Sequence, residues 1–191
     1  MEMIDPTLWA SERIRPLKRS EYDRLVQLGC FEDEKIELLD GMLVAMTPQG
    51  SGHSHAIRLL TELFMRGVGN RASVQCQLPL GASDDSEPEP DIAVVPRQEY
   101  FDDHPTRAHL IVEVADTSLR KDRLLKGALY ARVGIPEYWI VNVPERVVEV
   151  YRSPRDGEYR SVTTHGTEEL IHPLAFTDVN IAVADLFRKA G

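Results

Sequence analysis

Two acidic residues in the middle of the chain lie where an isolated charge is costly. Asp91 opens the apolar run 91–95, and Glu113 lies within a second apolar run, 110–114. Such runs are typical of strands buried on both faces, where an unaccompanied carboxylate is strongly destabilising or becomes protonated. Two acids that converge repel each other unless a proton or a cation lies between them. Asp91 and Glu113 therefore predict an oxygen-lined site for a hard divalent cation, most naturally Mg²⁺. The alternative for Glu113 is an ion pair with a helix cation.

A lysine and a further acid follow Glu113 on a predicted helix, residues 119–133. Asp122 and Lys126 are four residues apart and therefore lie on one face of that helix. Beside two metal-bound carboxylates, a lysine can orient an attacking water and stabilise negative charge that develops on a phosphate. This combination predicts metal-assisted hydrolysis of a phosphodiester. The alternative is a surface ion pair between Asp122 and Lys126 that has no chemical role.

The same helix is positively charged in a chain that is acidic overall. Residues 120–132 include five cations and one acid, hence a local charge of +4, which predicts a phosphate-facing surface. A solvated helix face is an equal alternative for Arg132. The whole chain has 31 acidic and 22 basic residues and a net charge of −9, which counts against non-specific binding of nucleic acid. The five cations are Arg120, Lys121, Arg123, Lys126 and Arg132.

Hydrophobic periodicity predicts the elements that must position these residues. Asp40-Gly41 between two apolar runs is a strong hairpin signal, because the tight turn needs positive φ at both positions. The strand–helix–strand unit over residues 113–143 implies an α/β fold with a mixed central sheet flanked by helices. The predicted strands are 35–39, 42–46, 73–80, 91–95, 110–114, 138–143, 147–151 and 159–163, and the predicted helices are 20–28, 54–66, 119–133 and 182–190.

Length and composition predict one domain that spans residues 1–191, with a core over about 20–185. No apolar stretch is long enough to cross a membrane, so no membrane association is predicted. The first ten residues include Glu2, Asp5 and Pro6 and lack a basic segment followed by an apolar one. We therefore predict a cytoplasmic protein without a signal peptide. Two cysteines are too few for a disulfide framework.

Several consecutive motifs resemble those of one protein family. The central ones are PDIAVV (90–95), IVEVADTS (111–118), RKDRLLK (120–126) and LYARVGIPEYWIV (129–141). Two more lie upstream, IELLDG (36–41) and SGHSHAI (51–57). Over about residues 20–185 the chain resembles the Uma2 family of restriction endonuclease-like proteins.

The resemblance implies a restriction endonuclease-like PD-(D/E)XK fold in which Asp91 and Glu113 are metal ligands. It also implies that the backbone carbonyl of Val114 completes the coordination of Mg²⁺, with Mn²⁺ as a substitute. In the general superfamily motif the lysine lies two residues after the glutamate, where this chain has Ala115. The resemblance therefore implies that Lys126 reaches the same pocket from the neighbouring helix.

Other polar residues are supporting candidates. The resemblance implies that Glu37 is an upstream acid that holds a metal-bound water or a second ion. Asp122 and His55 are predicted to support the site. His53 and His55 form a His-x-His pair ahead of the helix 54–66, and such a pair either binds a transition metal or lies exposed at a helix end.

Two glutamines, Gln75 and Gln77, alternate on a predicted strand and either reach the site or give that strand a polar edge. Tyr138 and Trp139 are predicted to pack in the core. The segment 81–90 is too polar and too rich in proline for regular structure. Its acids are predicted to be solvated, and they are Asp84, Asp85, Glu87 and Glu89.

These residues together predict a Mg²⁺-dependent endonuclease that hydrolyses phosphodiester bonds in DNA. DNA is the expected partner, and a homodimer is predicted because many nucleases of this type cut both strands as dimers. Two alternatives remain open at this point. One is a nucleic-acid or protein interaction module that has the same fold and no turnover, and the other is a phosphodiesterase that acts on small molecules.

Overall fold

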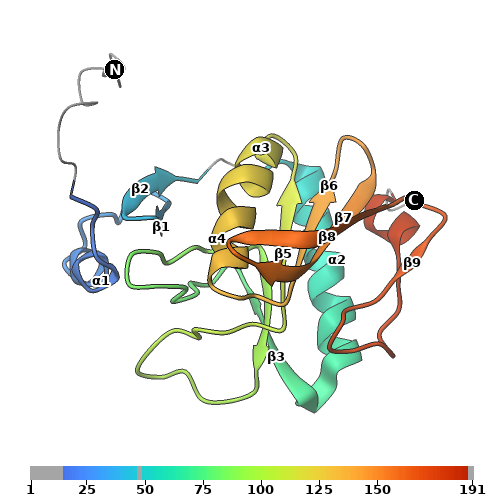
Figure 1. Ribbon diagram of the computed structural model, residues 1–191, viewed down its shortest axis with the longest axis horizontal. Helices are drawn as coiled ribbons and strands as arrows, with labels where there is room; N and C mark the ends of the chain where they lie inside the picture. The colour runs from blue at the N-terminus through green and yellow to red at the C-terminus, as the bar shows by residue number, and fades with distance from the viewer. Residues whose placement is uncertain (1–14, 47–48, 189–191) are drawn as a thin grey trace.

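A six-stranded sheet forms the centre of the structure, a computed structural model that describes residues 15–46 and 49–188 (Figure 1). The strand order is β3-β4-β5-β6-β7-β8. β5 and β6 run parallel, and every other neighbouring pair in this sheet is antiparallel, which confirms the predicted mixed sheet. The strands are β3 (Ala72–Cys76), β4 (Ile92–Pro96), β5 (Leu110–Ala115), β6 (Glu137–Asn142), β7 (Val147–Arg155) and β8 (Glu158–His165).

Helices cover both faces of the sheet (Figure 1). α2 (Ser51–Val68) packs on one face, against a cluster that includes Val112 and Val114 of β5. The opposite face carries a second cluster, which includes Ile111 and Ala115 of β5 together with Tyr130 of α4 (Gly127–Arg132). Because successive side chains of a strand point to opposite faces, Glu113 lies on the α4 face. This alternation determines which helix can supply a partner to the Glu113 carboxylate.

The predicted hairpin forms a separate two-stranded sheet from β1 (Ile36–Leu39) and β2 (Met42–Ala45). Its turn has the two positive φ angles that the Asp-Gly pair predicts, 49° at Asp40 and 75° at Gly41. The hairpin is fixed to the segment 83–87, because Leu38 and Glu87 exchange backbone hydrogen bonds of 2.8 and 3.3 Å. β1 thereby carries Glu37 towards the central sheet.

The helix predicted over residues 119–133 is not continuous. It consists of α3 (Leu119–Lys121), a π-helical turn (Asp122–Lys126) and α4. The N–H of Gly127 donates to the Asp122 carbonyl five residues earlier, and the Tyr138 hydroxyl donates to the same carbonyl at 3.2 Å. A single π turn within an α-helix is frequent at functional sites, and here both of its end residues are buried.

Three other predictions need correction at their boundaries. The strand predicted to reach residue 80 ends at Cys76, because Gln77 has a positive φ of 51° that breaks the extended backbone. The predicted helix 54–66 is longer and runs from Ser51 to Val68. A short 3₁₀ helix, Val183–Phe187, occupies part of the helix predicted over 182–190, after a small sheet of β9 (Leu170–Ile171) and β10 (Ile181–Ala182). Residues 189 and 190 lie outside the described part of the chain.

The first helix, α1 (Arg19–Gln27), begins one residue earlier than predicted. Its entry is stabilised by the Glu21 carboxylate, which accepts the Lys18 N–H at 2.9 Å, and Ser20 makes no cap. No helix within residues 15–46 and 49–188 is long and apolar enough to cross a membrane. The single domain over residues 1–191 stays a prediction.

One buried acid, Glu137, has a structural role at the start of β6. It is fully buried and accepts hydrogen bonds from the Trp139 indole at 2.9 Å and from the Leu174 N–H at 2.5 Å. The Arg152 guanidinium of β7 pairs with it at 2.7 Å. Trp139 is fully buried, as predicted, and packs against Phe64 of α2. Glu137 therefore ties the central sheet to the C-terminal segment.

Replacing Glu137 with alanine should lower the free energy of unfolding by about 2–4 kcal/mol, because Arg152 and the Trp139 N–H would lose their acceptor. Urea unfolding of the purified chain measures this loss. The exposed acid Glu168 is a matched control, and its replacement with alanine should change stability by less than about 0.5 kcal/mol. Equal stability of the two variants would show that Glu137 does not hold these elements together.

Candidate active site

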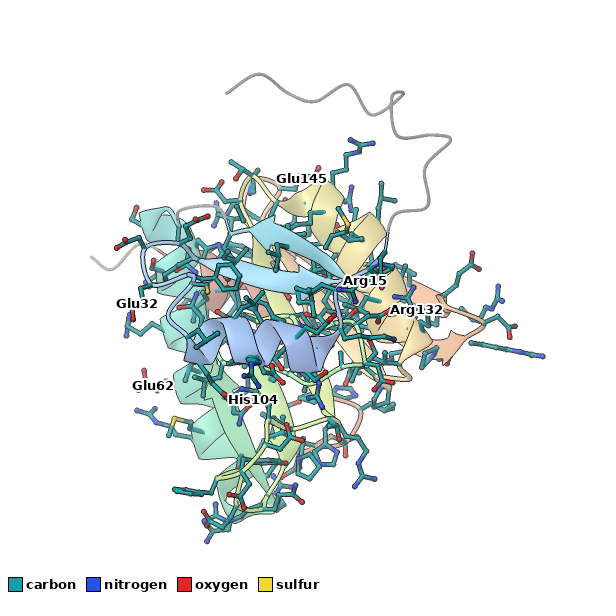
Figure 2. All side chains as sticks on the ribbon, turned by 90° about the vertical axis from the view of Figure 1, so that its left-hand side faces the viewer. Arg15, Glu32, Glu62, His104, Arg132 and Glu145 are labelled. Atoms are coloured by element: carbon teal, nitrogen blue, oxygen red, sulfur yellow. The ribbon has the colours of Figure 1, made fainter. Side chains whose placement is uncertain are left out.

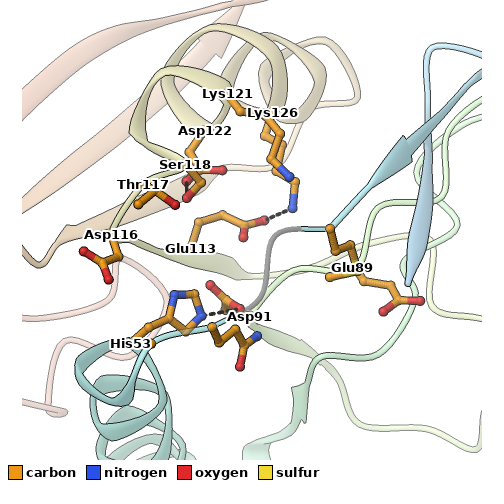
Figure 3. Close-up of a pocket in the computed structure, with 13 residues that line it drawn as sticks. His53, Glu89, Asp91, Glu113, Asp116, Thr117, Ser118, Lys121, Asp122 and Lys126 are labelled. Carbon is orange, nitrogen blue, oxygen red and sulfur yellow. Dashed lines mark hydrogen bonds and ion pairs between the residues drawn. The ribbon is translucent and has the colours of Figure 1, made fainter. Parts of the chain in front are cut away.

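A cavity of about 310 Å³ opens between the N-terminus of α2, the end of β5 and the π-helical turn (Figure 3). It contains Asp91, Glu113 and Lys126, the three residues that the sequence singled out. They come from three different elements, and all three side chains are buried. The other charged or ionisable lining residues are His53, Glu89, Asp116, Lys121 and Asp122.

The pairing of β4 with β5 brings Asp91 and Glu113 together. Ile92 pairs with Val112 in this antiparallel ladder, so one step further along Asp91 comes opposite Glu113. The N–H of Val114 donates to Asp91 Oδ2 at 2.8 Å. Because the N–H and C=O of one strand residue point to the same edge, the Val114 carbonyl also faces the Asp91 side. The two carboxylates and this carbonyl thus converge from neighbouring strands.

Lys126 lies between two acids at the floor of the cavity. Its Nζ is 2.9 Å from Glu113 Oε1 and 3.0 Å from Glu37 Oε2. The Tyr130 hydroxyl, one helical turn further on, also donates to Glu113 Oε1 at 2.8 Å. Lys126 is 2% exposed, so its ammonium is screened very little by water. The lysine therefore reaches the pocket from the helix, as the resemblance implies.

Glu37 is fully buried and joins both lysines of the cavity. Its Oε1 accepts from Lys121 Nζ at 3.0 Å, and its Oε2 pairs with Lys126 and accepts the Glu89 N–H at 3.3 Å. Burial alone would raise the pKa of Glu37, but the two lysines outweigh burial and lower that pKa. Glu37 is therefore ionised at neutral pH and holds the lysines in place.

For Glu113, the effect of burial on the pKa outweighs that of the neighbouring lysine. Burial, together with the acids Asp91, Asp122 and Glu37, raises its pKa to about 8, against the effect of Lys126. The carboxylates also raise the pKa of Lys126, although burial opposes them, so this lysine stays protonated. Four acids compete for two lysines, and a cation that approached Asp91 and Glu113 would lower the free energy of their ionised forms.

The π-helical turn positions Asp122 as well as Lys126. Asp122 is 2% exposed, and the Ser118 hydroxyl donates to its Oδ2 at 2.5 Å. Burial raises the pKa of Asp122, while the Ser118 hydrogen bond and Lys126 lower it. The alternative of a solvated surface pair between Asp122 and Lys126 is wrong, because both side chains are buried.

His53, and not the predicted His55, lines the active-site cavity. His55 does not line this cavity and instead lines another one, with Arg146 and Phe187. His53 lines the active-site cavity, and its Nε2 is 3.1 Å from Asp91 Oδ1. A helix turns by about 100° per residue, so two residues apart on α2 point in different directions. The predicted supporting role therefore moves from His55 to His53.

The predicted basic stripe does not face solvent as a free cationic surface. Lys121 and Lys126 pair with Glu37, and Arg123 donates to Glu149 at 3.0 Å. Arg132, for which a solvated face was an equal alternative, pairs with Asp40. Among the described residues only Arg120 of the five has no acid partner. Most of this positive charge therefore stabilises the fold or the site.

Sequence reasoning did not assign Tyr130 to the site, and it named Lys121 only as one cation of the basic stripe. Lys121 and Tyr130 lie on the helix that carries Lys126, so helical spacing gives a signal for both. Gln77 donates to Asp91 Oδ1 at 3.4 Å, which was one of two alternatives for it. Glu87 is buried and not solvated as predicted, because the hairpin pairs with its backbone.

The donor set fits a hard divalent ion. No three His, Cys, Asp or Glu side chains within residues 15–46 and 49–188 are grouped as a metal ion would need if bound by protein alone. Mg²⁺ does not need such a group, because one or two carboxylates, waters and a substrate phosphate complete its coordination. Asp91 and Glu113, with the Val114 carbonyl, supply oxygen ligands only, which favours Mg²⁺ or Mn²⁺ over softer metals.

Fold and site together define the restriction endonuclease-like architecture, a mixed sheet between helices with paired acids and a lysine at its edge. A crystal structure from Anabaena variabilis ATCC 29413, described as "a putative nuclease belonging to DUF820", has this fold: TM-score 0.72 and 20% identity, covering 90% of this chain and 98% of that one. The chain belongs to the Uma2 family, whose model, described as "Putative restriction endonuclease", matches residues 19–184.

Another solved structure, the type IIG restriction endonuclease BpuSI, is similar over 61% of this chain and 14% of its own length. Its TM-score is 0.41 and its identity is 16%, too low to establish a shared fold. No curated protein matches the chain. The family and the fold indicate a nuclease of the restriction endonuclease type.

Replacing Lys126 with methionine should lower the free energy of unfolding of the metal-free chain by about 3–5 kcal/mol near pH 8, because Glu37 and Glu113 would lose their shared cation. Without the lysine, burial keeps the pKa of both acids above about 4.3, the pKa of a glutamic acid in the unfolded chain. A group whose pKa is higher in the folded state contributes stability that is present below the unfolded pKa and lost as pH rises. The loss of unfolding free energy caused by Lys126→Met should therefore become smaller as the pH falls towards about 5.

Urea unfolding in the presence of a chelator at both pH values measures this change. Lys35, which is exposed, is the control, since its replacement with methionine removes the same charge and should cost less than about 0.5 kcal/mol. A penalty that is constant with pH, or that grows as pH falls, would contradict the assigned pairing.

Proposed function

We propose that the chain is a Mg²⁺-dependent endonuclease that hydrolyses phosphodiester bonds in DNA. The observation that carries this proposal is the position of Lys126 Nζ, within 3.0 Å of both Glu113 and Glu37 in a cavity that also contains Asp91. Buried acids with one shared lysine are expensive as purely structural features. Their convergence at an open cavity supports a catalytic role.

In the proposed mechanism, Asp91, Glu113 and the Val114 carbonyl would hold the ion. When bound, the ion supplies a Lewis acid and lowers the pKa of a bound water. The Glu113 and Glu37 carboxylates raise the pKa of Lys126 against the effect of burial, which favours its protonated form. Its ammonium stabilises the negative charge that develops on the phosphate during attack.

Glu37 acts through the lysines in this proposal. Its carboxylate orients the Lys126 and Lys121 ammonium groups, both of which line the cavity. Lys121 is 25% exposed, so it lies nearer to the opening and is placed to contact an entering phosphate. His53 contacts one oxygen of Asp91 and the Val114 N–H donates to the other, which fixes the carboxylate.

The wild-type chain should nick supercoiled DNA when Mg²⁺ or Mn²⁺ is added and should not do so with a chelator. Single substitutions Asp91→Asn, Glu113→Gln and Lys126→Ala should each lower the nicking rate by about 100-fold or more, because each removes an interaction with the ion or with the developing charge. Gel electrophoresis of plasmid DNA measures the rate. Glu168→Gln, which makes the same charge change on an exposed side chain, should cleave like wild type.

No cleavage of single- or double-stranded DNA or RNA by the wild-type chain would count against a nuclease. Hydrolysis of bis-p-nitrophenyl phosphate without cleavage of nucleic acid would instead indicate a phosphodiesterase of small molecules. In either case the loss of activity in the variants must be compared with their unfolding curves, since Lys126 also stabilises the fold.

An interaction module without turnover is the second candidate function. The net charge of −9 and the ion-paired cations of the helix favour it, because they leave little free positive charge for DNA. Homodimer formation and cytoplasmic location stay predictions from the sequence.

Calorimetry separates the module from the nuclease. We expect wild-type protein to bind Mn²⁺ at one site and Asp91→Asn to bind it at least about tenfold more weakly, since a carboxylate ligand is replaced by an amide. Glu168→Gln is again the matched control. Equal heats for Asp91→Asn and wild type would favour the non-catalytic module.

A further inference from the structure

A further cavity, of about 410 Å³, lies beside α1 and the loop that follows β4. Figure 2 shows one of its lining residues, His104, next to α1. Aromatic side chains, Tyr22, Tyr100 and Phe101, form part of its wall. It is also strongly acidic, and its lining acids are Asp23, Glu87, Glu89, Asp102 and Asp103.

Glu87 is a buried acid without a donor. It is 4% exposed, and its Oε2 has no hydrogen-bond partner within the described part of the chain. Arg19 Nη1 is 3.9 Å from Oε2, and His104 Nε2 is 3.9 Å from Oε1, distances too long for hydrogen bonds. Arg19 is also shared with Asp103 at 3.4 Å. A buried acceptor in this position is destabilising unless a ligand donates to it.

The backbone of Glu87 is held in place beside the cavity. Its backbone N–H and C=O both bond to Leu38 of the hairpin, so the residue is fixed at the edge of β1. Burial and the nearby Asp23 carboxylate together raise the pKa of Glu87 to about 7, against the opposing effect of Arg19. Two acids therefore face each other with too little positive charge between them, and a cation would relieve their repulsion.

The walls of the cavity favour an organic cation over a metal ion. Tyr22 is buried, Tyr100 is held by a 2.8 Å hydrogen bond from its hydroxyl to the Pro96 carbonyl, and Phe101 lies at the rim, where it is 96% exposed. Aromatic faces bind ammonium groups through cation–π attraction and pack against alkyl chains. A softer metal ion held by protein ligands alone would need three close acidic, cysteine or histidine side chains, and no such group of three exists among residues 15–46 and 49–188.

We propose that this acidic aromatic cavity binds a small organic cation that carries two or more ammonium groups on an alkyl chain. One ammonium pairs with Glu87 and Asp23 inside the cavity, and another pairs with Asp102 and Asp103 near Phe101. The site is separate from the catalytic one. Glu89 lines both cavities, but its side chain points away from Asp91 and Glu113 (Figure 3). Binding there does not depend on whether the chain cleaves DNA.

Spermidine is the probe, and calorimetry of the full chain at physiological ionic strength measures its affinity, because such salt screens diffuse attraction to an acidic protein. We expect Glu87→Gln to bind spermidine about tenfold or more weakly, through loss of a charge-assisted hydrogen bond. Phe101→Ala, at an exposed position, should weaken binding about three- to fivefold. Glu168→Gln should leave the affinity unchanged, and urea unfolding confirms that each variant is folded.

Three results would overturn the proposal. The first is the absence of spermidine binding, and the second is equal weakening by Glu87→Gln and Glu168→Gln, which would reveal diffuse charge attraction only. The third is a preference for another class of ligand. Displacement of spermidine by Mg²⁺ at equal concentration would assign the cavity to a metal ion. Tighter binding of a trilysine peptide than of spermidine would assign it to a basic protein segment.

Discussion

The shared ammonium of Lys126 is the interaction on which the site depends. Glu113 from β5 and Glu37 from β1 both pair with this one cation. Both carboxylates are buried, and removal of the lysine would destabilise their ionised forms. The lysine reaches them because a π-helical turn interrupts the helix and because Tyr138 of β6 donates to the carbonyl in that turn. The hairpin, the sheet and the helix therefore meet at one charge, and its removal affects both fold and chemistry.

This arrangement explains how an acidic protein can contain a site for anionic substrates. The overall net charge of −9 is a sum over the chain, whereas a phosphate responds to the charges within about a Debye length. Inside the cavity, two lysines and a bound divalent ion would offset the four acids Asp91, Glu113, Asp122 and Glu37. Outside it, Arg123 and Arg132 are paired with Glu149 and Asp40, so the outer surface offers little attraction to DNA. A substrate would thus be held mainly by the cavity itself.

Much of the fold and part of the site could be predicted from the sequence. Asp40-Gly41 specified a hairpin by its turn chemistry, and the cost of charge within two buried apolar runs indicated that Asp91 and Glu113 share a site. The partners of the cations could not be predicted, because they come from distant segments: Glu37 pairs with Lys121, and Asp40 with Arg132. His53 and His55 differ by only two positions, so the sequence could not decide which one faces Asp91. The π turn has no sequence signal that is distinct from an ordinary helix.

The central claim is that Asp91 and Glu113 together hold a hard divalent ion beside Lys126. Anomalous diffraction from crystals soaked in Mn²⁺ tests it most directly, because the scattering locates the ion without any assumption about substrate. The predicted result is an anomalous peak between the carboxylates of Asp91 and Glu113, absent from crystals of Asp91→Asn. A peak elsewhere, such as among Asp102 and Asp103, with none at the catalytic cavity, would contradict the account.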